Sequence, residues 1–413
     1  MQTLFKTALA AGLLGLSGAA TAGLFGAKSE MYIVQLEPGA LVNQTIGTLS
    51  RTLLGQVGAG APIFEYDTVL TGFAAPLTAR QARLLGRLPL VASIEPDRLV
   101  TAGATQTNPE YGLDRIDERA LPLDGSYRYP DSAGAGVHVY VIDTGINPDH
   151  VEFTGRVGNG QNFVNDGPAG LGGLLPIDLL GLLLGSGDAD PEAWQDCNGH
   201  GTHVAGTAAG TQYGVAKQAT VHAVRVLNCG GSGAGSAVIA GIEWVAENAQ
   251  YPAVVNLSLG GGASSAEDAA IRNLYQRGIL PVVAAGNDNT DACTTSPARA
   301  PEAVTVASSD SADRESSFSN HGTCVDIIAP GSSIRSANYS NNTGSTVLSG
   351  TSMAAPHVAG AAALLLGDTP GLSTADLTAL LIGNATSNAI ALSPANAGTP
   401  NLLLNTQPAA NNP

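Results

Sequence analysis

The sequence predicts an α/β domain with a doubly wound, mostly parallel sheet flanked by helices, preceded by a small α+β domain. The first observation is a series of short, nearly continuous apolar runs, at residues 137–142, 221–227, 254–259, 279–285 and 304–307. Such runs are typical of strands buried on both faces of a parallel sheet. The second is that helical patterns, for example at residues 236–249 and 264–277, separate the runs. This alternation indicates a doubly wound domain between about residues 110 and 405.

The first 22 residues predict a secretory signal peptide. Lys6 precedes an apolar run at residues 7–16, and Ala20-Thr21-Ala22 follows as a cleavage pattern. The apolar run is too short to span a bilayer, which argues against a membrane anchor. We therefore expect a secreted, extracellular protein in which disulfide bonds can form.

Residues 23–103 predict the small α+β domain. Strand patterns occur at residues 32–36, 72–77 and 91–95. Thr78 can cap a helix over residues 79–88. A low-complexity stretch at residues 101–108 then has the character of an exposed linker, open to proteolysis.

Composition limits the possible functions. The 413 residues include 18 Lys and Arg against 34 Asp and Glu, which gives a formal net charge of −16. An acidic chain is poorly suited to the phosphates of nucleic acids and of anionic lipids, so neither nucleic acid nor a membrane is an expected partner. With 44% hydrophobic and 13% charged residues, the chain is too apolar for a disordered protein and long enough to bury a core.

Three polar segments carry side chains suited to nucleophilic catalysis. Asp143 ends a predicted buried strand, His200 lies in the Gly-rich segment 198–206, and Ser352 lies early in a predicted helix. A serine hydroxyl needs a base that accepts its proton, and histidine is that base near neutral pH. A buried aspartate fixes the imidazole tautomer. Each residue alone is typical of a turn, loop or helix cap, but together they predict an Asp-His-Ser triad.

These segments resemble those of the subtilase family of serine endopeptidases. The resemblance rests on residues 198–207, NGHGTHVAGT, and on residues 349–358, SGTSMAAPHV. It covers nearly the whole chain after the signal peptide and is nearest to the proteinase K branch, in particular to its aqualysin-type enzymes. It implies a subtilisin-like fold and hydrolysis of peptide bonds, with the triad in the chain order Asp, His, Ser.

The resemblance also implies a role for each matching residue. Ser352 is then the nucleophile, His200 the general base, and Asp143 the carboxylate that orients the base. Asn287 matches the residue whose side-chain amide donates to the oxyanion. His203, the second histidine of its motif, is implied to be structural.

Two Gly-rich segments match the edges on which subtilases hold a peptide as an added β-strand. With the wall of the first specificity pocket, the implied substrate-binding residues are Gly231, Ser232, Gly233, Ser258, Leu259, Gly260, Gly261, Ala284, Ala285 and Gly286. The pocket wall is small and uncharged, which predicts a roomy apolar pocket and broad specificity without selection of Arg or Lys. Gly235 stands where close relatives carry a Tyr, so the resemblance does not define the more distal subsite.

The four cysteines become candidate disulfides after secretion. They are Cys197, Cys229, Cys293 and Cys324, and four cysteines allow three connectivities. The resemblance to aqualysin-type enzymes implies the pairs Cys197–Cys229 and Cys293–Cys324. Each pair would close a loop of about thirty residues, which stabilises the fold by roughly 3–4 kcal/mol in the chain-entropy account.

Structural calcium is the cofactor that the resemblance implies, because loop carboxylates and carbonyls suit this ion. One site would combine the Asp326 carboxylate with the carbonyls of Pro301 and Ala303. The second candidate set is Asp114, Asp117, Asp124 and Ser126. Ordinary capping and surface charge is the alternative for both sets. The same alternatives, metal or solvated charge, apply to the acidic cluster of Asp188, Asp190, Glu192 and Asp196.

The resemblance divides the chain into a removable part and a working part. Residues 23–103 are similar to the inhibitor-like propeptide of subtilases, which assists folding, blocks the cleft and is cut off by the enzyme itself. A catalytic domain over residues 104–406 and a short tail over residues 407–413 would follow. A stable accessory domain that stays attached is the alternative for the first part.

A Leu-rich insertion at residues 168–187 lengthens the spacing between Asp143 and His200 beyond what is usual in the proteinase K branch. We expect it to pack on the body of the domain as a hairpin or short helix. Alternatively, it exposes an apolar patch near the cleft and shapes access to the site.

The expected protein is therefore a secreted, calcium-stabilised serine endopeptidase with broad, apolar-leaning specificity. It is made as an autoprocessed zymogen, is inhibited by its own propeptide, and acts as a monomer on proteins and peptides. The alternative is a catalytically inactive binding protein on the same fold. The presence of Asp143, His200, Ser352 and Asn287 together favours the enzyme.

Overall fold

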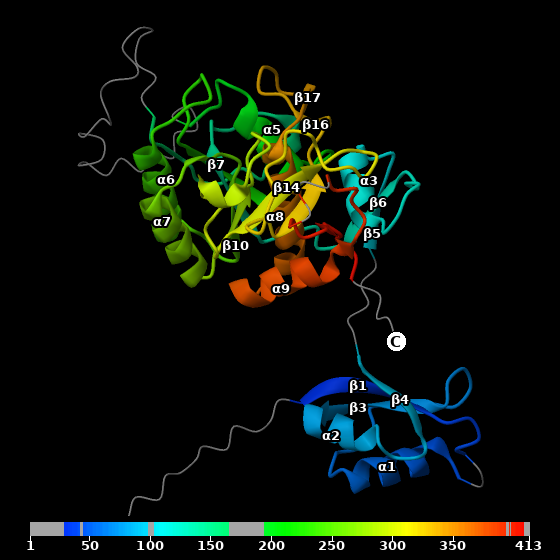
Figure 1. Cartoon of the computed structure of the whole chain (residues 1–413). Helices are drawn as coiled ribbons and strands as arrows, with labels where there is room; N and C mark the ends of the chain where they lie inside the picture. Colours follow the sequence, from blue (N-terminus) through cyan, green and yellow to red (C-terminus); the bar gives the residue numbers. More distant parts are fainter. Residues whose placement is uncertain are drawn as a thin grey trace, which may run out of the picture. The chain divides into compact units, whose positions relative to one another are not determined.

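The computed structural model describes residues 29–41, 44–97, 103–164, 194–393, 396 and 398–408. The predicted signal peptide and the Leu-rich insertion lie outside the described residues, as do Asp188, Asp190 and Glu192 of the acidic cluster. The chain divides into two compact units, Met1–Val100 and Thr101–Pro413, and each is described by itself (Figure 1).

The described part of the first unit forms a four-stranded antiparallel sheet with two helices. Its elements are β1 (Ser29–Leu36), α1 (Ile46–Gln56), β2 (Phe64–Tyr66), β3 (Gly72–Thr78), α2 (Ala79–Leu85) and β4 (Val91–Pro96). The strand order is β2-β3-β1-β4. Both helices lie on one face of the sheet, where Leu49, Leu53 and Leu85 share a core with Val34 and Phe73 (Figure 1).

The predicted strands of this unit and the helix after Thr78 are confirmed. Thr78 and Gln81 form a reciprocal capping box at the start of α2, which ends at Leu85. Helix α1 and strand β2 add to the prediction. The helical pattern of α1 is weakened by Gly47 and Gly55, although the Thr45 hydroxyl caps it by accepting from the Thr48 amide.

The second unit contains a mostly parallel sheet of nine strands among its described residues. In spatial order these are β18 (Thr386–Ser387), β19 (Leu402–Leu403), β15 (Ile327–Pro330), β14 (Val304–Ser309), β12 (Leu280–Ala284), β10 (Ala253–Leu257), β7 (His138–Asp143), β9 (Thr220–Arg225) and β8 (Gln161–Asn162). Neighbouring strands run parallel except β18 and β19 at one edge. The five predicted apolar runs are confirmed as β7, β9, β10, β12 and β14.

Helices and short strands complete the second unit. The helices are α3 (Tyr111–Asp117), α5 (His200–Ala209), α6 (Gly235–Asn248), α7 (Ser265–Gln276), α8 (Thr351–Asp368) and α9 (Thr374–Asn384), with 3₁₀ turns at Val151–Phe153 and Ala292–Thr294. The short strands form antiparallel pairs: β5 (Gly103–Thr107) with β6 (Ser126–Pro130), β11 (Gly261–Gly262) with β13 (Thr295–Ser296), and β16 (Ile334–Ala337) with β17 (Ser345–Leu348).

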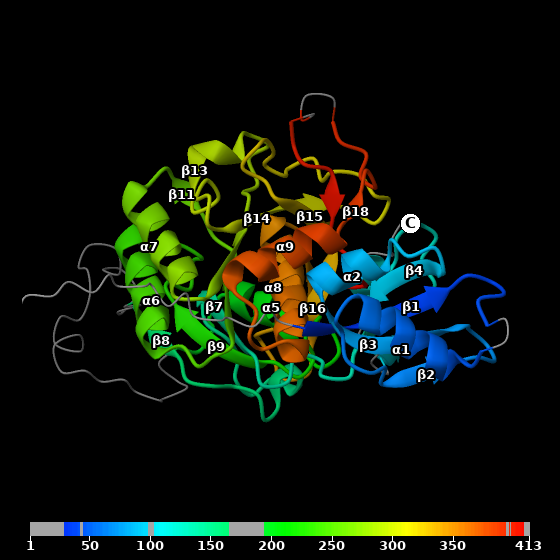
Figure 2. The same ribbon diagram turned by 90° about the horizontal axis from the view of Figure 1, so that it is seen from below.

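Alternate residues of the central strands enter two different hydrophobic cores. Val139 and Val141 of β7 lie in the core shared with α5 and α8, whereas Tyr140 and Ile142 lie in the core shared with α6 and α7. Helices α6 and α7 pack together at one side of the unit, and α8 runs through its centre against β10, β12 and β14 (Figure 2). The predicted doubly wound fold is thus confirmed, because both faces of the sheet are covered by helices. No helix within the described ranges is long and apolar enough to cross a membrane.

Both implied disulfides are present in the structure. Cys197 is bonded to Cys229 and Cys293 to Cys324, with sequence separations of 32 and 31 residues. Each bond fixes a loop that would otherwise be free in the unfolded chain. Such a constraint is expected to stabilise the folded state.

We expect replacement of both Cys293 and Cys324 by Ser to lower the free energy of unfolding by roughly 3–4 kcal/mol, because the unfolded chain regains the entropy of the open loop. Urea unfolding of the two proteins, followed by far-UV circular dichroism, measures the difference. The parent protein with a Ser333→Ala substitution serves as a surface control. A midpoint unchanged by the double substitution would contradict the expectation.

Candidate active site

Asp143 and His200 are brought together by the carboxyl end of β7 and the first residue of α5. His200 Nδ1 lies 2.8 Å from Asp143 Oδ1 and 2.9 Å from Oδ2. The Asp143 side chain is completely buried, and the Thr144 amide donates a further hydrogen bond of 2.7 Å to Oδ1. Because the carboxylate accepts from Nδ1–H, the neutral His200 ring keeps Nε2 as a free acceptor.

The surroundings of His200 act on its pKa in opposite directions. Burial of the ring lowers the pKa, but the charge of Asp143 and its hydrogen bond raise it, and Asp196 adds to the rise. The net effect is a pKa above the usual value for histidine. This environment therefore favours the imidazolium form, which a base has to adopt once it has accepted a proton.

Asp196 holds the start of helix α5. Its Oδ1 accepts from Thr144 Oγ1 and from the amides of Asn198 and Gly199, each at 2.9 Å. Its Oδ2 accepts from the Thr202 amide at 3.0 Å and from the Thr202 hydroxyl at 2.6 Å. Asp196 is buried, so its interpretation as a solvated charge is wrong, and both of its carboxylate oxygens accept hydrogen bonds from the chain. It is instead a positioning residue for the turn that carries His200.

Ser352 is the second residue of α8 and lies against the end of β10. Its hydroxyl donates to the Ser258 carbonyl at 3.1 Å, and the Ser258 hydroxyl donates to the Ser352 carbonyl at 2.8 Å. The Asn256 amide contacts the Ser258 hydroxyl in turn, at 2.9 Å. Within the described part of the chain no hydrogen bond joins Ser352 to His200.

Asn287 is fixed by the residue before Ser352. Its Oδ1 accepts from the Thr351 amide at 2.8 Å and from the Thr351 hydroxyl at 3.0 Å. The amide nitrogen, Nδ2, donates to no described residue. The Ser352 amide belongs to the first turn of α8, whose N–H groups have no intrahelical acceptor. Asn287 and Ser352 line the same cavity and therefore offer it two hydrogen-bond donors.

This cavity, which we call the Ser352 cavity, has a volume of about 450 Å³. Six of the implied substrate-binding residues line it, namely Leu259, Gly260, Gly261, Ala284, Ala285 and Gly286. Gly286 is required by its backbone, since φ is +108° and a Cβ atom there would lie 2.3 Å from Asn320 Nδ2. The lining also includes Asp288, an exposed acid that the prediction of an uncharged wall did not include.

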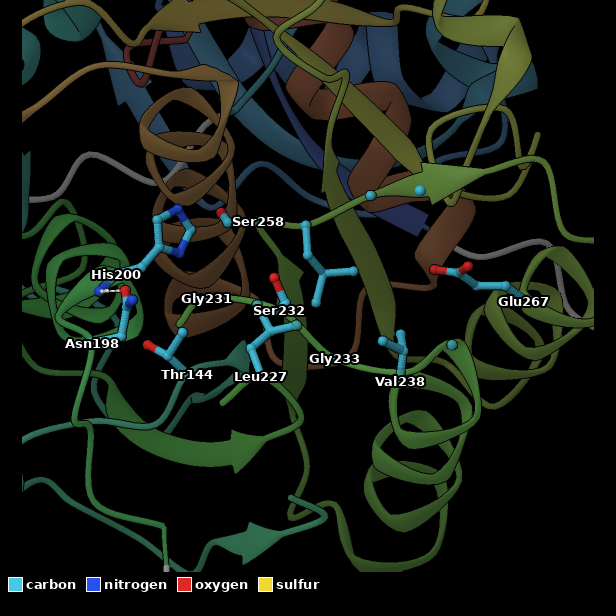
Figure 3. Close-up of a pocket in the computed structure, with 14 residues that line it drawn as sticks. Thr144, Asn198, His200, Leu227, Gly231, Ser232, Gly233, Val238, Ser258 and Glu267 are labelled. Atoms are coloured by element: carbon cyan, nitrogen blue, oxygen red, sulfur yellow. Dashed lines mark hydrogen bonds between the residues drawn. The ribbon is translucent and has the colours of Figure 1, made fainter. Parts of the chain in front are cut away.

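A second cavity, the distal pocket, begins at His200 (Figure 3). It has a volume of about 400 Å³ and shares Leu259, Gly260 and Gly261 with the Ser352 cavity. The remaining implied substrate-binding residues, Gly231, Ser232, Gly233 and Ser258, line it. Its far end is formed by Val238 and Glu267, which the sequence analysis did not identify. Glu267 looks like an ordinary acid in the first turn of a helix, so only the fold reveals its position.

His203 lies apart from this chemistry. Its ring is buried, and Nε2 contacts the Ile334 carbonyl at 3.0 Å. Burial lowers the pKa of His203 to about 4. The ring is therefore neutral near pH 7 and takes part in packing between α5 and β16.

The candidate calcium residues form two separate groups. Oδ1 of Asp114 and Oδ1 of Asp117 are both buried, and neither has a hydrogen-bond partner in the described part of the chain. Burial is the main cause that raises the pKa of both carboxyls, that of Asp117 to about 7. Asp124 instead forms an ion pair with Arg128 and accepts from the Ser126 amide at 2.9 Å. Asp114 and Asp117 therefore offer unpartnered carboxylate oxygens to a cation, whereas Asp124 already has a charged partner.

Asp326 precedes β15, and Pro301 and Ala303 precede the neighbouring strand β14, so all three stand at one edge of the sheet. The Thr305 amide donates to Asp326 Oδ2 at 2.8 Å, and burial raises the pKa of the carboxyl to about 6. One carboxylate with nearby carbonyls is a donor set that suits calcium. No group of three or more His, Cys, Asp or Glu within the described ranges could hold a metal ion.

Comparison with known proteins agrees with the geometry. The profile of the subtilase family matches residues 134–402, and that of peptidase inhibitor I9 matches residues 31–102. An extracellular serine proteinase of a Thermus species is 48% identical over 373 residues, which cover 90% of this chain and 84% of that protein. Proteinase R of Parengyodontium album is 39% identical over 380 residues, covering 91% and 88%.

A solved structure shows the same fold. The crystal structure of a cold adapted subtilisin-like serine proteinase is 50% identical, with a TM-score of 0.64, and the match covers 73% of this chain and 99% of that one. The predictions of family, fold, enzyme class and secretion are therefore confirmed. The chain belongs to the subtilase family and is an extracellular serine endopeptidase produced with an I9 inhibitor propeptide.

Proposed function

We propose that Ser352, His200 and Asp143 form the catalytic triad of this endopeptidase. The observation that carries the proposal is the 2.8 Å contact between His200 Nδ1 and the buried Asp143, next to the cavity that Ser352 lines. Ser352 Oγ, which rests on the Ser258 carbonyl, turns to His200 Nε2 and gives up its proton as it attacks the substrate carbonyl. Asp143 keeps the proton of the ring on Nδ1 and stabilises the imidazolium.

The reaction then has two steps, acylation of Ser352 and deacylation by water. His200 delivers the accepted proton to the leaving amine, which leaves an acyl group on Ser352 Oγ. Water enters, gives a proton to His200, and attacks the acyl carbonyl, and the proton returns to Ser352. During both attacks the negative charge on the substrate oxygen is stabilised by Asn287 Nδ2 and the Ser352 amide. The double anchor on Thr351 keeps the Asn287 amide in place without substrate.

We propose that a substrate peptide lies as an added strand between residues 231–233 and 258–261. Among the described residues β11 pairs with β13 alone, so the other side of this segment can offer backbone groups to a peptide. The side chain next to the cleaved bond enters the Ser352 cavity. Its small lining residues favour broad, apolar-leaning specificity at that position.

We propose that residues 23–103 are the removable propeptide and an intramolecular inhibitor, with the mature chain starting near Ala104. Two facts support this division. The inhibitor I9 match ends at residue 102, and Gly103–Thr107 already pairs with β6 of the second unit as strand β5. The catalytic domain would then cover residues 104–406, and we propose that residues 407–413 form a short tail.

Calcium is proposed as a structural ion at two places. Asp114 and Asp117 would hold it through their unpartnered buried oxygens, and Asp326 would hold it with the carbonyls of Pro301 and Ala303. Asp124 and Ser126 stay candidates of the first group. Asp117 Oδ2 already pairs with Arg128 at 3.3 Å, so a bound cation would compensate the buried Oδ1 atoms of Asp114 and Asp117.

The first test replaces Ser352 by Ala. We expect casein hydrolysis to fall by about 10⁶-fold, because the nucleophile is lost, and the precursor to stay uncut near Ala104. Casein hydrolysis, electrophoresis of the secreted protein and labelling by a serine-directed phosphonylating inhibitor are measured together. Ser340→Ala, a change of an exposed serine, is the control. Hydrolysis by Ser352→Ala equal to that of Ser340→Ala would refute Ser352 as the nucleophile, whereas no hydrolysis by either variant would favour the inactive binding protein.

The second test concerns the pKa of His200. Asp143 raises this pKa, so wild-type kcat/KM rises with pH as His200 loses its proton. Asp143→Asn removes the raising charge, and the acid limb of kcat/KM is expected to move to lower pH. In addition kcat falls by about 10⁴-fold, because the amide no longer enforces the Nδ1–H tautomer. Asp149→Asn, an exposed neighbour, should keep the wild-type profile. An acid limb of kcat/KM that stays at the wild-type pH, or moves to higher pH, in Asp143→Asn would contradict the proposed role of Asp143.

The third test concerns calcium at Asp114 and Asp117. Calcium at a hundredfold excess over its dissociation constant is expected to raise the free energy of unfolding of the Ser352→Ala protein by about 3 kcal/mol, which is seen as a higher thermal midpoint. Asp117→Asn should weaken that response, while costing little stability in a chelator because burial of the charge is relieved. Glu247→Gln removes an exposed charge as the control. An undiminished calcium response in Asp117→Asn would exclude this site.

A further inference from the structure

Glu267 occupies an unusual place for a carboxylate. It is the third residue of α7, it is only 7% exposed, and its side chain points from the helix into the distal pocket (Figure 3). His200 and Asn198 stand at the opposite end of the same pocket. A charged group thus lies within the cavity that begins at the proposed base.

The local sequence predicts that the Glu267 carboxylate accepts from the Ser264 amide, but this hydrogen bond does not form. Ser264 and Glu267 have the spacing of a capping box, in which the glutamate would accept from the serine amide. The Ser264 hydroxyl does accept from the Glu267 amide, at 3.3 Å. The Ser264 amide, however, donates to Ser296 Oγ at 2.9 Å instead. The Glu267 carboxylate therefore does not cap the start of the helix.

No described residue compensates this buried carboxylate. It accepts no hydrogen bond from the described part of the chain, and burial, with a smaller effect of Asp268, raises its pKa to about 7. Asp268 itself is matched by Arg299 and by Ser296. The described residues lining the distal pocket include no Lys or Arg. A cation entering the pocket would compensate this carboxylate.

The rest of the pocket suits a long cationic side chain. Val238 and Leu259 give it apolar walls, against which the methylene stem of Lys or Arg can pack. At Gly235 an added Cβ would meet no atom within 4 Å, so the pocket stays open at that point. Apolar walls that end in a carboxylate match an aliphatic stem that ends in a positive charge.

The proposed course of the substrate leads into this pocket. Leu259, Gly260 and Gly261 line both cavities, so a peptide on this segment places one side chain next to Ser352 and a more distant one in the distal pocket. We propose that Glu267 selects a Lys or Arg side chain at a substrate position other than the one next to the cleaved bond. This inference rests on the proposed function and adds a charge preference to its otherwise broad specificity.

The test uses fluorogenic peptides with a fixed residue at the cleaved bond. Each of the remaining peptide positions is varied, one at a time, among Lys, Arg, norleucine and Glu. The value of kcat/KM is measured for the mature wild-type enzyme, for Glu267→Gln and for Glu243→Gln. Glu243 is an exposed acid of α6 outside the pocket lining, so its variant removes the same charge. At one position the wild type should cleave the Lys or Arg peptide with a kcat/KM about tenfold higher than that of the norleucine peptide. The kcat/KM of the Glu peptide should be lower still.

In Glu267→Gln the ratio of Lys to norleucine should fall to about one, whereas Glu243→Gln should keep the wild-type ratio. A wild type without a cation preference at any position overturns the proposal, whether or not Glu267→Gln folds. A preference that survives in an active Glu267→Gln enzyme also overturns it. Failure of the proposed triad looks different, because it shows as hydrolysis of the same peptides by Ser352→Ala, whatever the side-chain preference of the wild type.

Discussion

The buried carboxylate of Asp143 is the constraint around which the active-site region is built. A charge removed from water has to be matched by donors, and here the partners are the His200 ring and the Thr144 amide. The ring can reach the carboxylate only if the start of α5 stands at the carboxyl end of β7. The parallel sheet provides this meeting point, since its strand ends converge at one edge where both helices and loops begin.

A second buried carboxylate keeps that meeting point rigid. Asp196 binds Thr144 on one side and the turn of Asn198, Gly199 and Thr202 on the other, so it ties the strand that carries Asp143 to the helix that carries His200. The next residue, Cys197, is bonded to Cys229, and Asn198 donates to the Cys229 carbonyl at 3.0 Å. The proposed base and the proposed substrate edge at residues 231–233 thus share one cross-linked support.

The fold was predictable because its strands are buried on both faces, which leaves continuous apolar runs in the sequence. The proposed triad could be predicted because short motifs surround His200 and Ser352. What the sequence did not reveal has two physical causes. Contacts between distant segments decide that Thr144 binds Asp196 and that Ser296 takes the Ser264 amide away from Glu267. Competition between local partners decides that Asp124 pairs with Arg128. Helix α1 was hidden for another reason, since Gly47 and Gly55 obscure its periodicity.

Buried acids of this chain differ in whether protein donors compensate their charge. We infer that the compensated acids hold the site together and that the others bind a partner. Asp143 and Asp196 are matched by protein donors, so their carboxylates hold the segments of the site together. Asp117 and Glu267 are left without full compensation, and burial raises the pKa of each to about 7. An uncompensated buried acid lowers stability, so a site that retains one is suited to a partner that arrives later. The shape around each then indicates which partner fits: a neighbouring acid at Asp117 favours a small cation, and an open apolar pocket at Glu267 favours a long side chain.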